Sequence, residues 1–198
     1  MFEELIFQKL WIVLPVWLAL YVSDYYLTIL GASYMKAGAC EHFIFKGSYE
    51  LAPELQSDIN SLRLFSPKFI RAVFVSSVLI VILWFVSRAY PPFTFYLRFF
   101  IGGIILQEVA ILVRHVRNIA LFHFARNHRG ISGQIRYENW LSYKLSGIDL
   151  LSFACVFLVV FIFTGSLSFL GGSLMTAMAG LKHLKLSIKA TKENRPRQ

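Results

Sequence analysis

Several polar and ionisable residues stand inside long apolar runs, where their types and spacing could support chemistry. Asp24 has a hydroxyl one helical turn further on, at Thr28, and Glu108 lies well inside a later apolar run. Ionisable groups are costly within the hydrocarbon of a bilayer, so each such position raises a question of function. The candidate residues of this intramembrane polar seam are Asp24, Thr28, Gln107, Glu108, Arg114, His115 and Asn118.

Most of the polar seam falls on one predicted helix, the third apolar run. Glu108 and His115 are seven residues apart and share a helical face, while Gln107, Arg114 and Asn118 form a neighbouring stripe. The seam therefore runs from the middle of the helix to a basic loop. It can conduct protons or ions, hold a polar headgroup, or join this helix to another through Glu108, and the sequence leaves these uses open.

No motif of a catalytic or metal centre accompanies these residues. The five histidines lack the spacing of a zinc motif, the two cysteines form no CxxC, and the serines near glycine in the late segment form no nucleophile elbow. The sequence therefore predicts no catalytic residue, no metal and no cofactor. It favours a non-enzymatic role and leaves an enzyme open.

The elements that must position the seam are membrane-spanning helices. The chain has 198 residues, of which 57% are hydrophobic and only 16% charged, against about 25% charged residues in a typical soluble domain. A soluble protein of this size needs a polar exterior that this composition does not supply. We therefore predict one all-α polytopic helix bundle over residues 1–180, without a separate soluble domain.

Apolar runs predict five spans, with a break between the last two at Thr164-Gly165-Ser166. As one helix, residues 148–181 would be about 51 Å long, which exceeds the hydrocarbon core of about 30 Å. The alternative is four spans, of which the last is long and projects from the membrane. The five predicted spans are residues 5–30, 68–90, 94–116, 148–164 and 167–184.

The distribution of charge favours five spans. Basic residues collect in the loop at residues 117–144 and in the tail at residues 182–197. The positive-inside rule places both segments in the cytoplasm, which requires two spans between them. We therefore expect a multi-pass protein of the cell membrane with a cytoplasmic C-terminus. The net charge of +9 suits anionic lipid headgroups, and nucleic acid is not an expected partner.

Amphipathic segments are expected at the membrane surface. Residues 54–65 and 131–147 carry apolar or aromatic side chains near helical spacing, which predicts interfacial helices. Asp149 is expected at the start of the fourth span, near the headgroups. Residues 181–198 predict a basic amphipathic tail. The lysines expected to contact headgroups share one face, and they are Lys182, Lys185, Lys189 and Lys192.

Small residues recur every four positions in the last apolar segment, at Ser168, Gly172, Thr176 and Gly180. Helices can approach closely along such a stripe, within one chain or between chains. The stripe favours a homo-oligomer, and the basic loop at residues 126–147 or the tail offers a surface to a cytoplasmic protein.

These features together favour a small membrane-embedded subunit of a larger assembly that senses or permeabilises the bilayer. A proton- or ion-coupled transporter or channel that uses the intramembrane carboxylates is the first alternative. An intramembrane lipid-modifying enzyme is the second, and it requires a hydrated cavity that reaches His115.

Two short motifs resemble those of a family of small uncharacterised prokaryotic membrane proteins. Asp24 and Thr28 match an Asp-x-x-x-Thr helix in the first span. Glu50-Leu51-Ala52-Pro53 is similar to a Glu-Leu-Asn-Pro turn before the second span, with Ala52 in place of the asparagine. The resemblance covers about a third of the chain. It implies a polytopic membrane fold and assigns no activity.

Overall fold

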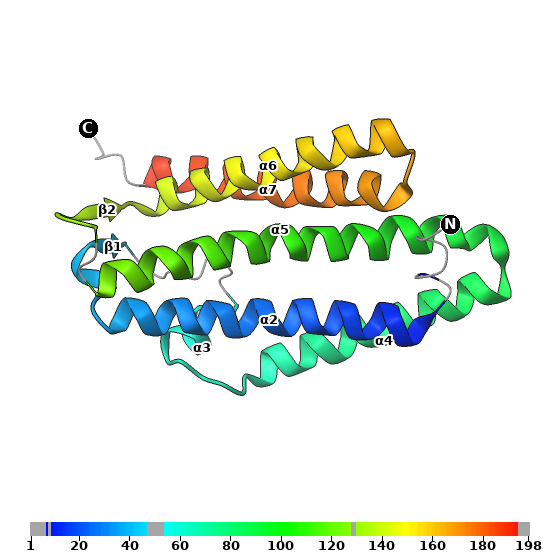
Figure 1. Cartoon of the computed structure of the whole chain (residues 1–198), viewed down its shortest axis with the longest axis horizontal. Helices are drawn as coiled ribbons and strands as arrows, with labels where there is room; N and C mark the ends of the chain where they lie inside the picture. The colour runs from blue at the N-terminus through cyan, green and yellow to red at the C-terminus, as the bar shows by residue number, and fades with distance from the viewer. Residues whose placement is uncertain (1–6, 8, 47–53, 128–129, 194–198) are drawn as a thin grey trace.

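The computed structural model describes residues 7, 9–46, 54–127 and 130–193, and its long elements are all helices. The long helices lie along the long axis of the molecule (Figure 1). Their bounds are α2 Leu10–Lys36, α4 Pro67–Ala89, α5 Thr94–Arg126, α6 Asn139–Thr164 and α7 Leu167–Glu193. The shorter elements are α3 Gln56–Asn60, the 3-10 turns η1 Ala39–Glu41 and η2 Pro91–Phe93, and the strands β1 Phe43–Phe45 and β2 Ile135–Tyr137.

Four of the described helices, α2, α4, α5 and α6, are long and apolar enough to cross a membrane. Large apolar side chains cover their outer surfaces: Phe74 on α4 is 68% exposed, and Phe163 on α6 is 84% exposed. Such surfaces are stable against lipid and unfavourable in water. The chain therefore has the character of a multi-pass membrane protein. Helix α7 is not among the four, because glycine, serine and lysine residues lower its hydropathy.

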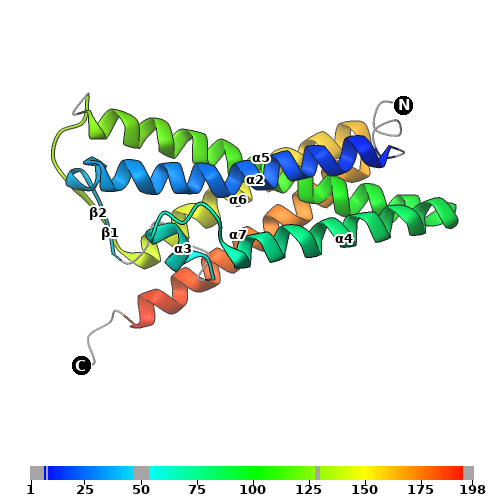
Figure 2. The ribbon, with the colours of Figure 1, turned by 90° about the horizontal axis from the view of Figure 1, so that it is seen from below.

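Helix α5 lies between α2 and the α6–α7 pair, and α4 packs on the side of α2 (Figure 1). The helices α6 and α7 run antiparallel, joined at Gly165, whose φ of +65° is the left-handed conformation that glycine adopts without strain. The predicted break at Thr164-Gly165-Ser166 is therefore present. Both strands and the C-terminal end of α7 lie at one end of the bundle, and the Gly165 turn lies at the other (Figure 2).

The predicted span bounds agree with α4 and differ for α2, α5 and α6. Helix α2 continues to Lys36 and α5 to Arg126, well past the predicted ends at residues 30 and 116. Helix α6 begins at Asn139, so the interfacial helix expected at residues 131–147 is in large part the first turns of this span. No proline interrupts these stretches, and the helical hydrogen bonds continue into the polar residues.

The interfacial helix expected at residues 54–65 is much shorter in the structure, where α3 covers only Gln56–Asn60. Helix α3 ends before Leu62. The φ of Leu62 is +52°, which is outside the range of a right-handed α-helix. Ser66 then caps α4 by accepting a hydrogen bond from the Phe69 amide, and its hydroxyl donates to Asp58 Oδ2 at 2.5 Å. Beyond residue 180 the tail continues α7 as one helix to Glu193.

The stripe of small residues packs against helices of the same chain. A side chain at Gly102 of α5 would collide with Ser168, and one at Gly171 would collide with the Phe99 carbonyl group. Further along α7, Gly180 faces α6, where an added Cβ would lie 3.0 Å from the Gly147 carbonyl oxygen. The close approach expected from the stripe is therefore present within the chain, and a homo-oligomer stays a prediction.

A parallel strand pair joins the connection after α2 to the loop before α6. Strands β1 and β2 pair in the register Phe43↔Ile135 to Phe45↔Tyr137. Outside the ladder, His42 Nδ1 lies 2.9 Å from the Gly133 carbonyl oxygen, and Lys46 Nζ lies 3.1 Å from Glu138 Oε2. The sequence reading contained no strand here. The pair fixes two loops against each other at the end of the bundle where the basic residues collect.

Candidate functional site

A cavity of about 410 Å³ opens at the basic end of the bundle, between α2, α5, α6 and α7. Apolar residues of α5, α6 and α7 form part of its wall, and Phe43, Phe45 and Tyr137 of the strand pair cover one side. The other part of the wall is polar. Its ionisable residues are Asp24, Glu54, Arg114, His115, Arg117, Asp149, Lys182 and His183.

The depth of this cavity follows from helix geometry. Ser146 stands about 27 Å along α6 from Thr164, and His183 about 24 Å along α7 from Leu167, at 1.5 Å per residue. The hydrocarbon core is about 30 Å thick. When α6 crosses the bilayer from its Thr164 end, the cavity therefore lies where hydrocarbon meets the headgroups.

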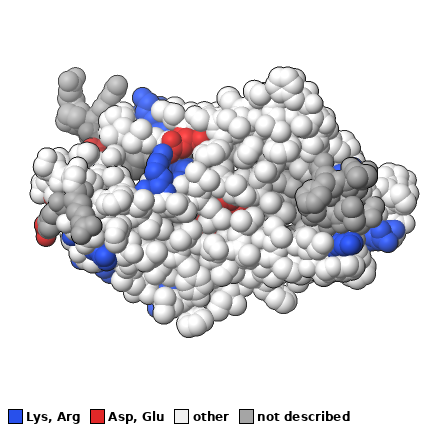
Figure 3. Space-filling model, in the orientation of Figure 1, with Lys and Arg blue, Asp and Glu red and all other residues white. Residues whose placement is uncertain are grey.

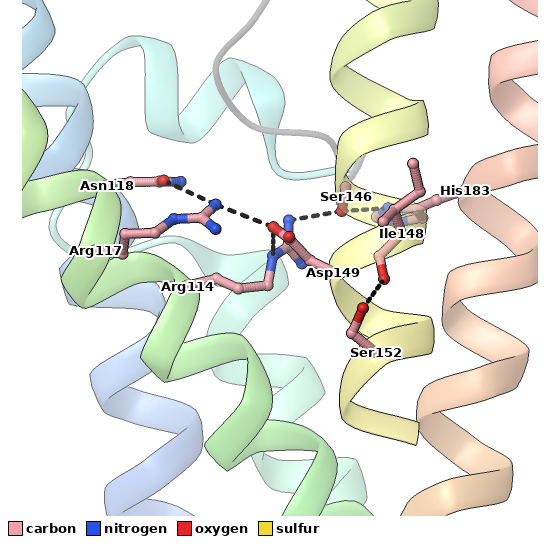
Figure 4. Close-up of polar contacts among 8 residues, drawn as sticks. All are labelled: Arg114, Arg117, Asn118, Ser146, Ile148, Asp149, Ser152 and His183. Carbon is pink, nitrogen blue, oxygen red and sulfur yellow. Dashed lines mark hydrogen bonds and ion pairs between the residues drawn. The ribbon is translucent and has the colours of Figure 1, made fainter. Parts of the chain in front are cut away.

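Asp149 lies between two arginines of α5 (Figure 4). Its Oδ2 atom is 3.0 Å from Arg117 Nη2 and 3.5 Å from Arg114 Nε. Arg117 also contacts Asn118 Oδ1, at 3.4 Å. The expectation that Asp149 begins a span is wrong, because α6 starts ten residues earlier, and Asp149 instead faces α5. One carboxylate shared by two guanidinium groups leaves this side of the cavity positive.

Ser146 connects three helices through its hydroxyl group (Figure 4). The Oγ atom accepts a hydrogen bond from Arg114 Nη2 of α5 at 2.6 Å and lies 2.7 Å from His183 Nδ1 of α7. The Ser146 hydroxyl can donate its proton to His183 Nδ1 in the tautomer that carries the ring proton on Nε2. Ser146 is only 3% exposed, yet it lines the cavity.

A second polar contact joins α2 to α5. Asp24 Oδ1 lies 2.8 Å from His115 Nε2, and Thr28 Oγ1 lies 3.4 Å from the same nitrogen while donating to the Asp24 carbonyl oxygen at 2.9 Å. The structure therefore brings together three members of the predicted seam. Asp24 and His115 both line the cavity.

Glu108 occupies a separate position. It lines a second cavity of about 220 Å³, whose other lining residues are mainly apolar and include Trp17 and Tyr21. Its Oε2 atom is buried and has no hydrogen-bond partner within the described part of the chain. Among the remaining seam residues of α5, Gln107, Arg114, His115 and Asn118 line the larger cavity.

The four lysines expected to contact headgroups lie in two different places. Lys182 lines the cavity, whereas Lys185, Lys189 and Lys192 are exposed on α7 outside it. Ser146 and His183 were missed by sequence reasoning because they lie 37 positions apart on different helices. One signal was present: Ser142, Ser146 and Asp149 follow the i, i+4, i+7 spacing of a helix face.

Among the described residues, no group of three or more His, Cys, Asp or Glu side chains is placed to hold a metal ion. Comparison of the chain with family models, with curated proteins and with solved structures finds no match. The motif at residues 50–53 lies outside the described residues. The function is therefore argued from the cavity itself.

Proposed function

We propose that this chain is a multi-pass protein of the cell membrane that binds an anionic lipid, or an amphiphile of the same chemistry, at the cytoplasmic headgroup level. The observation that carries the proposal is the cavity of about 410 Å³ at the basic end of the bundle. Its wall changes from a charged region, in which arginine, lysine and histidine stand beside three carboxylates, to aliphatic side chains. That combination suits a ligand with a charged head and an apolar chain.

The proposed topology has five spans, with α7 as the fifth. Helix α7 runs antiparallel to α6, so its basic end lies beside the loop that contains β2 (Figure 1). Placing both in the cytoplasm satisfies the positive-inside rule and puts the cavity on the cytoplasmic face. The cytoplasmic leaflet is also the one that carries most anionic lipid.

The cations of the wall favour a phosphate-bearing head. Arg117 has a side chain that is 61% exposed and presents a planar fork of donors, a geometry that matches phosphate oxygens. Lys182 lines the same cavity and makes no ion pair with a described residue. A phosphate there would add a charge-assisted hydrogen bond, worth about 1.5–3 kcal/mol.

A lipid titration followed by native mass spectrometry tests this proposal. Lys182→Ala should weaken binding of phosphatidylglycerol by about tenfold or more, as expected for loss of one such contact, and should change binding of phosphatidylcholine much less. Lys189→Ala is the matched control, since it removes an exposed lysine of the same helix outside the cavity. Equal affinity of the wild-type protein for both lipids, or equal losses in the two variants, would contradict the proposal.

The assembly subunit and the ion-coupled transporter stay predictions. The small-residue stripe that favoured an assembly is buried within the chain. For transport, the Asp24–His115 contact would be a natural participant, but Glu108 lies in the second, mainly apolar cavity. Lipid recognition uses the polar and apolar walls together, and we therefore place it first.

A further inference from the structure

We propose that Ser146 is a nucleophile, activated by His183, that cleaves an acyl ester of the amphiphile held in the cavity. The identity of the substrate rests on the proposed function, whereas the reactivity of Ser146 rests on its own contacts. No sequence motif marks Ser146 as a nucleophile, because the two partners come from different helices and not from a local turn.

The contacts of Ser146 are those that a nucleophilic hydroxyl needs. His183 Nδ1 at 2.7 Å is within reach of the hydroxyl proton. Arg114 Nη2 at 2.6 Å places a positive charge beside the oxygen, where it stabilises the negative charge that develops as the proton leaves. The Tyr143 ring packs edge-on against the His183 ring, with 6.0 Å between their centroids.

The surroundings distinguish this hydroxyl from one that only joins helices. Ser146, Arg114 and His183 all line the same cavity, so a ligand there would meet all three. Ser142 lines the cavity one turn earlier on α6 and lacks such an imidazole contact among the described residues. The chain thus contains a second serine in the same cavity as an internal comparison.

The position along the bilayer normal suits an acyl ester. The ester carbonyl of a membrane lipid lies between its apolar chain and its polar head, which is the boundary that Ser146 reaches about 27 Å from Thr164. The acyl chain would lie against Leu145, Leu150 and Leu186, while Arg117 and Lys182 would hold the head. The carbonyl carbon would then be near Ser146 Oγ.

The reaction is ordinary ester hydrolysis in two steps. In the first, Ser146 Oγ bonds to the carbonyl carbon as its proton passes to His183 Nδ1. The bond from that carbon to the alcohol oxygen then breaks, and the alcohol takes the proton from His183. In the second, a water molecule loses a proton to His183, attacks the acyl carbon and frees Ser146, which recovers the proton. Arg114 Nη2, which contacts Ser146 Oγ, stabilises the negative charge that develops on that oxygen.

A fluorophosphonate probe tests the nucleophile without any lipid. The purified full-length protein in detergent is treated with the probe, and the modified residue is identified by peptide mass spectrometry. We expect modification of Ser146 in the wild-type protein and in Ser142→Ala, and none at this site in Ser146→Ala. His183→Gln should slow modification by about 100-fold or more, the usual contribution of a general base.

An unmodified Ser146 in the folded wild-type protein would overturn the inference, as would an equal rate in His183→Gln. Phosphatidylglycerol binding by Ser146→Ala, measured by native mass spectrometry, separates this inference from the proposed function. Retained binding with no probe modification of the wild-type protein means that the nucleophile fails and lipid recognition stands. Modification of Ser146 without lipid binding means that the nucleophile stands and the proposed lipid recognition fails.

Discussion

Asp149 controls the charge of the cavity, because its carboxylate neutralises part of what two arginines supply. Its Oδ2 atom contacts both Arg114 and Arg117. The anion of a bound lipid would need the same donors. In the proposed complex, Asp149 and the anionic headgroup would compete for the donors of Arg114 and Arg117. The lipid affinity would then depend on how much more strongly the arginines bind the headgroup than they bind Asp149.

Asp149→Asn should strengthen the binding of phosphatidylglycerol by about tenfold, since about 1.4 kcal/mol of competing attraction is removed. It should also lower the thermal stability, because Arg114, which is mostly buried, loses its charged partner. Native mass spectrometry and a thermal unfolding scan measure the two effects. Glu138→Gln is the control, as Glu138 pairs with Lys46 at the strand pair. Weaker lipid binding by a folded Asp149→Asn protein would contradict the prediction.

Single residues can be singled out from the sequence where an ionisable side chain lies inside an apolar run. Asp24 and His115 stand out because ionisable groups are rare in spans, and the structure pairs them. Ser146 carries no such mark, since serine is common in membrane helices and its partner His183 belongs to another helix. Which serine meets which histidine depends on the rotation of packed helices, and a single sequence does not encode that in its spacing.

Helices α5 and α7 pack closely enough that their backbones approach each other at glycine residues. A Cβ atom at Gly103 would lie 2.8 Å from the Gly171 carbonyl carbon, so the two backbones nearly touch. Arg114 of α5 and His183 of α7 line the cavity further along the same two helices. The glycines therefore matter to the cavity although none of them lines it.

Gly171→Ala should destabilise the bundle by about 1–3 kcal/mol, the usual cost of overpacking, because its Cβ would collide with the Phe99 carbonyl group. The sign is diagnostic, since the same change in an open helix stabilises by about 1 kcal/mol. Thermal unfolding in detergent measures the change. Met178→Ala, at a position 70% exposed on the same helix, should change little. Equal or greater stability of Gly171→Ala would exclude the close contact.

Among the helices and strands, the sequence predicted features that depend on neighbouring residues and missed those that depend on contacts distant in the chain. The bounds of α4 and the break at Gly165 follow from proline, glycine and apolar run length. The start of α6 was missed because residues 139–147 are too polar to read as a span, yet nothing in them ends a helix. The strands were missed because each has three residues and a partner about 90 positions away.

Charge is distributed along the whole molecule in a way that fits a bilayer. The surface in Figure 3 is mostly neutral, with charged side chains toward the ends and an adjoining acidic and basic patch toward the left. The exposed Cys40 lies in η1, just before β1, and Thr164 is the last residue of α6. The strands and the turn between α6 and α7 lie at opposite ends of the bundle (Figure 1). In the proposed topology these two positions lie on opposite sides of the membrane.

In intact cells, a membrane-impermeant maleimide should label Thr164→Cys and leave Cys40 unlabelled until the membrane is permeabilised. The proposed five-span topology requires this difference, because it places α6 between a cytoplasmic loop and an external turn. The experiment uses a Cys155→Ser background, which removes the other exposed cysteine. Adding Cys40→Ser to this background checks that the label reacts with Cys40 and with no other group. Labelling of Cys40 and Thr164→Cys from the same side would rule out the topology.

The strand pair also determines when the cavity forms. The contacts of His42 with Gly133 and of Lys46 with Glu138 connect positions 91 and 92 residues apart. Closing so long a loop costs chain entropy, so these contacts form only after the intervening helices α4 and α5 have come together. During folding the cavity is thus open on the side of Phe43, Phe45 and Tyr137 until a late step. In the finished protein the same short ladder, with only three residues in each strand, is expected to exchange its amide protons early.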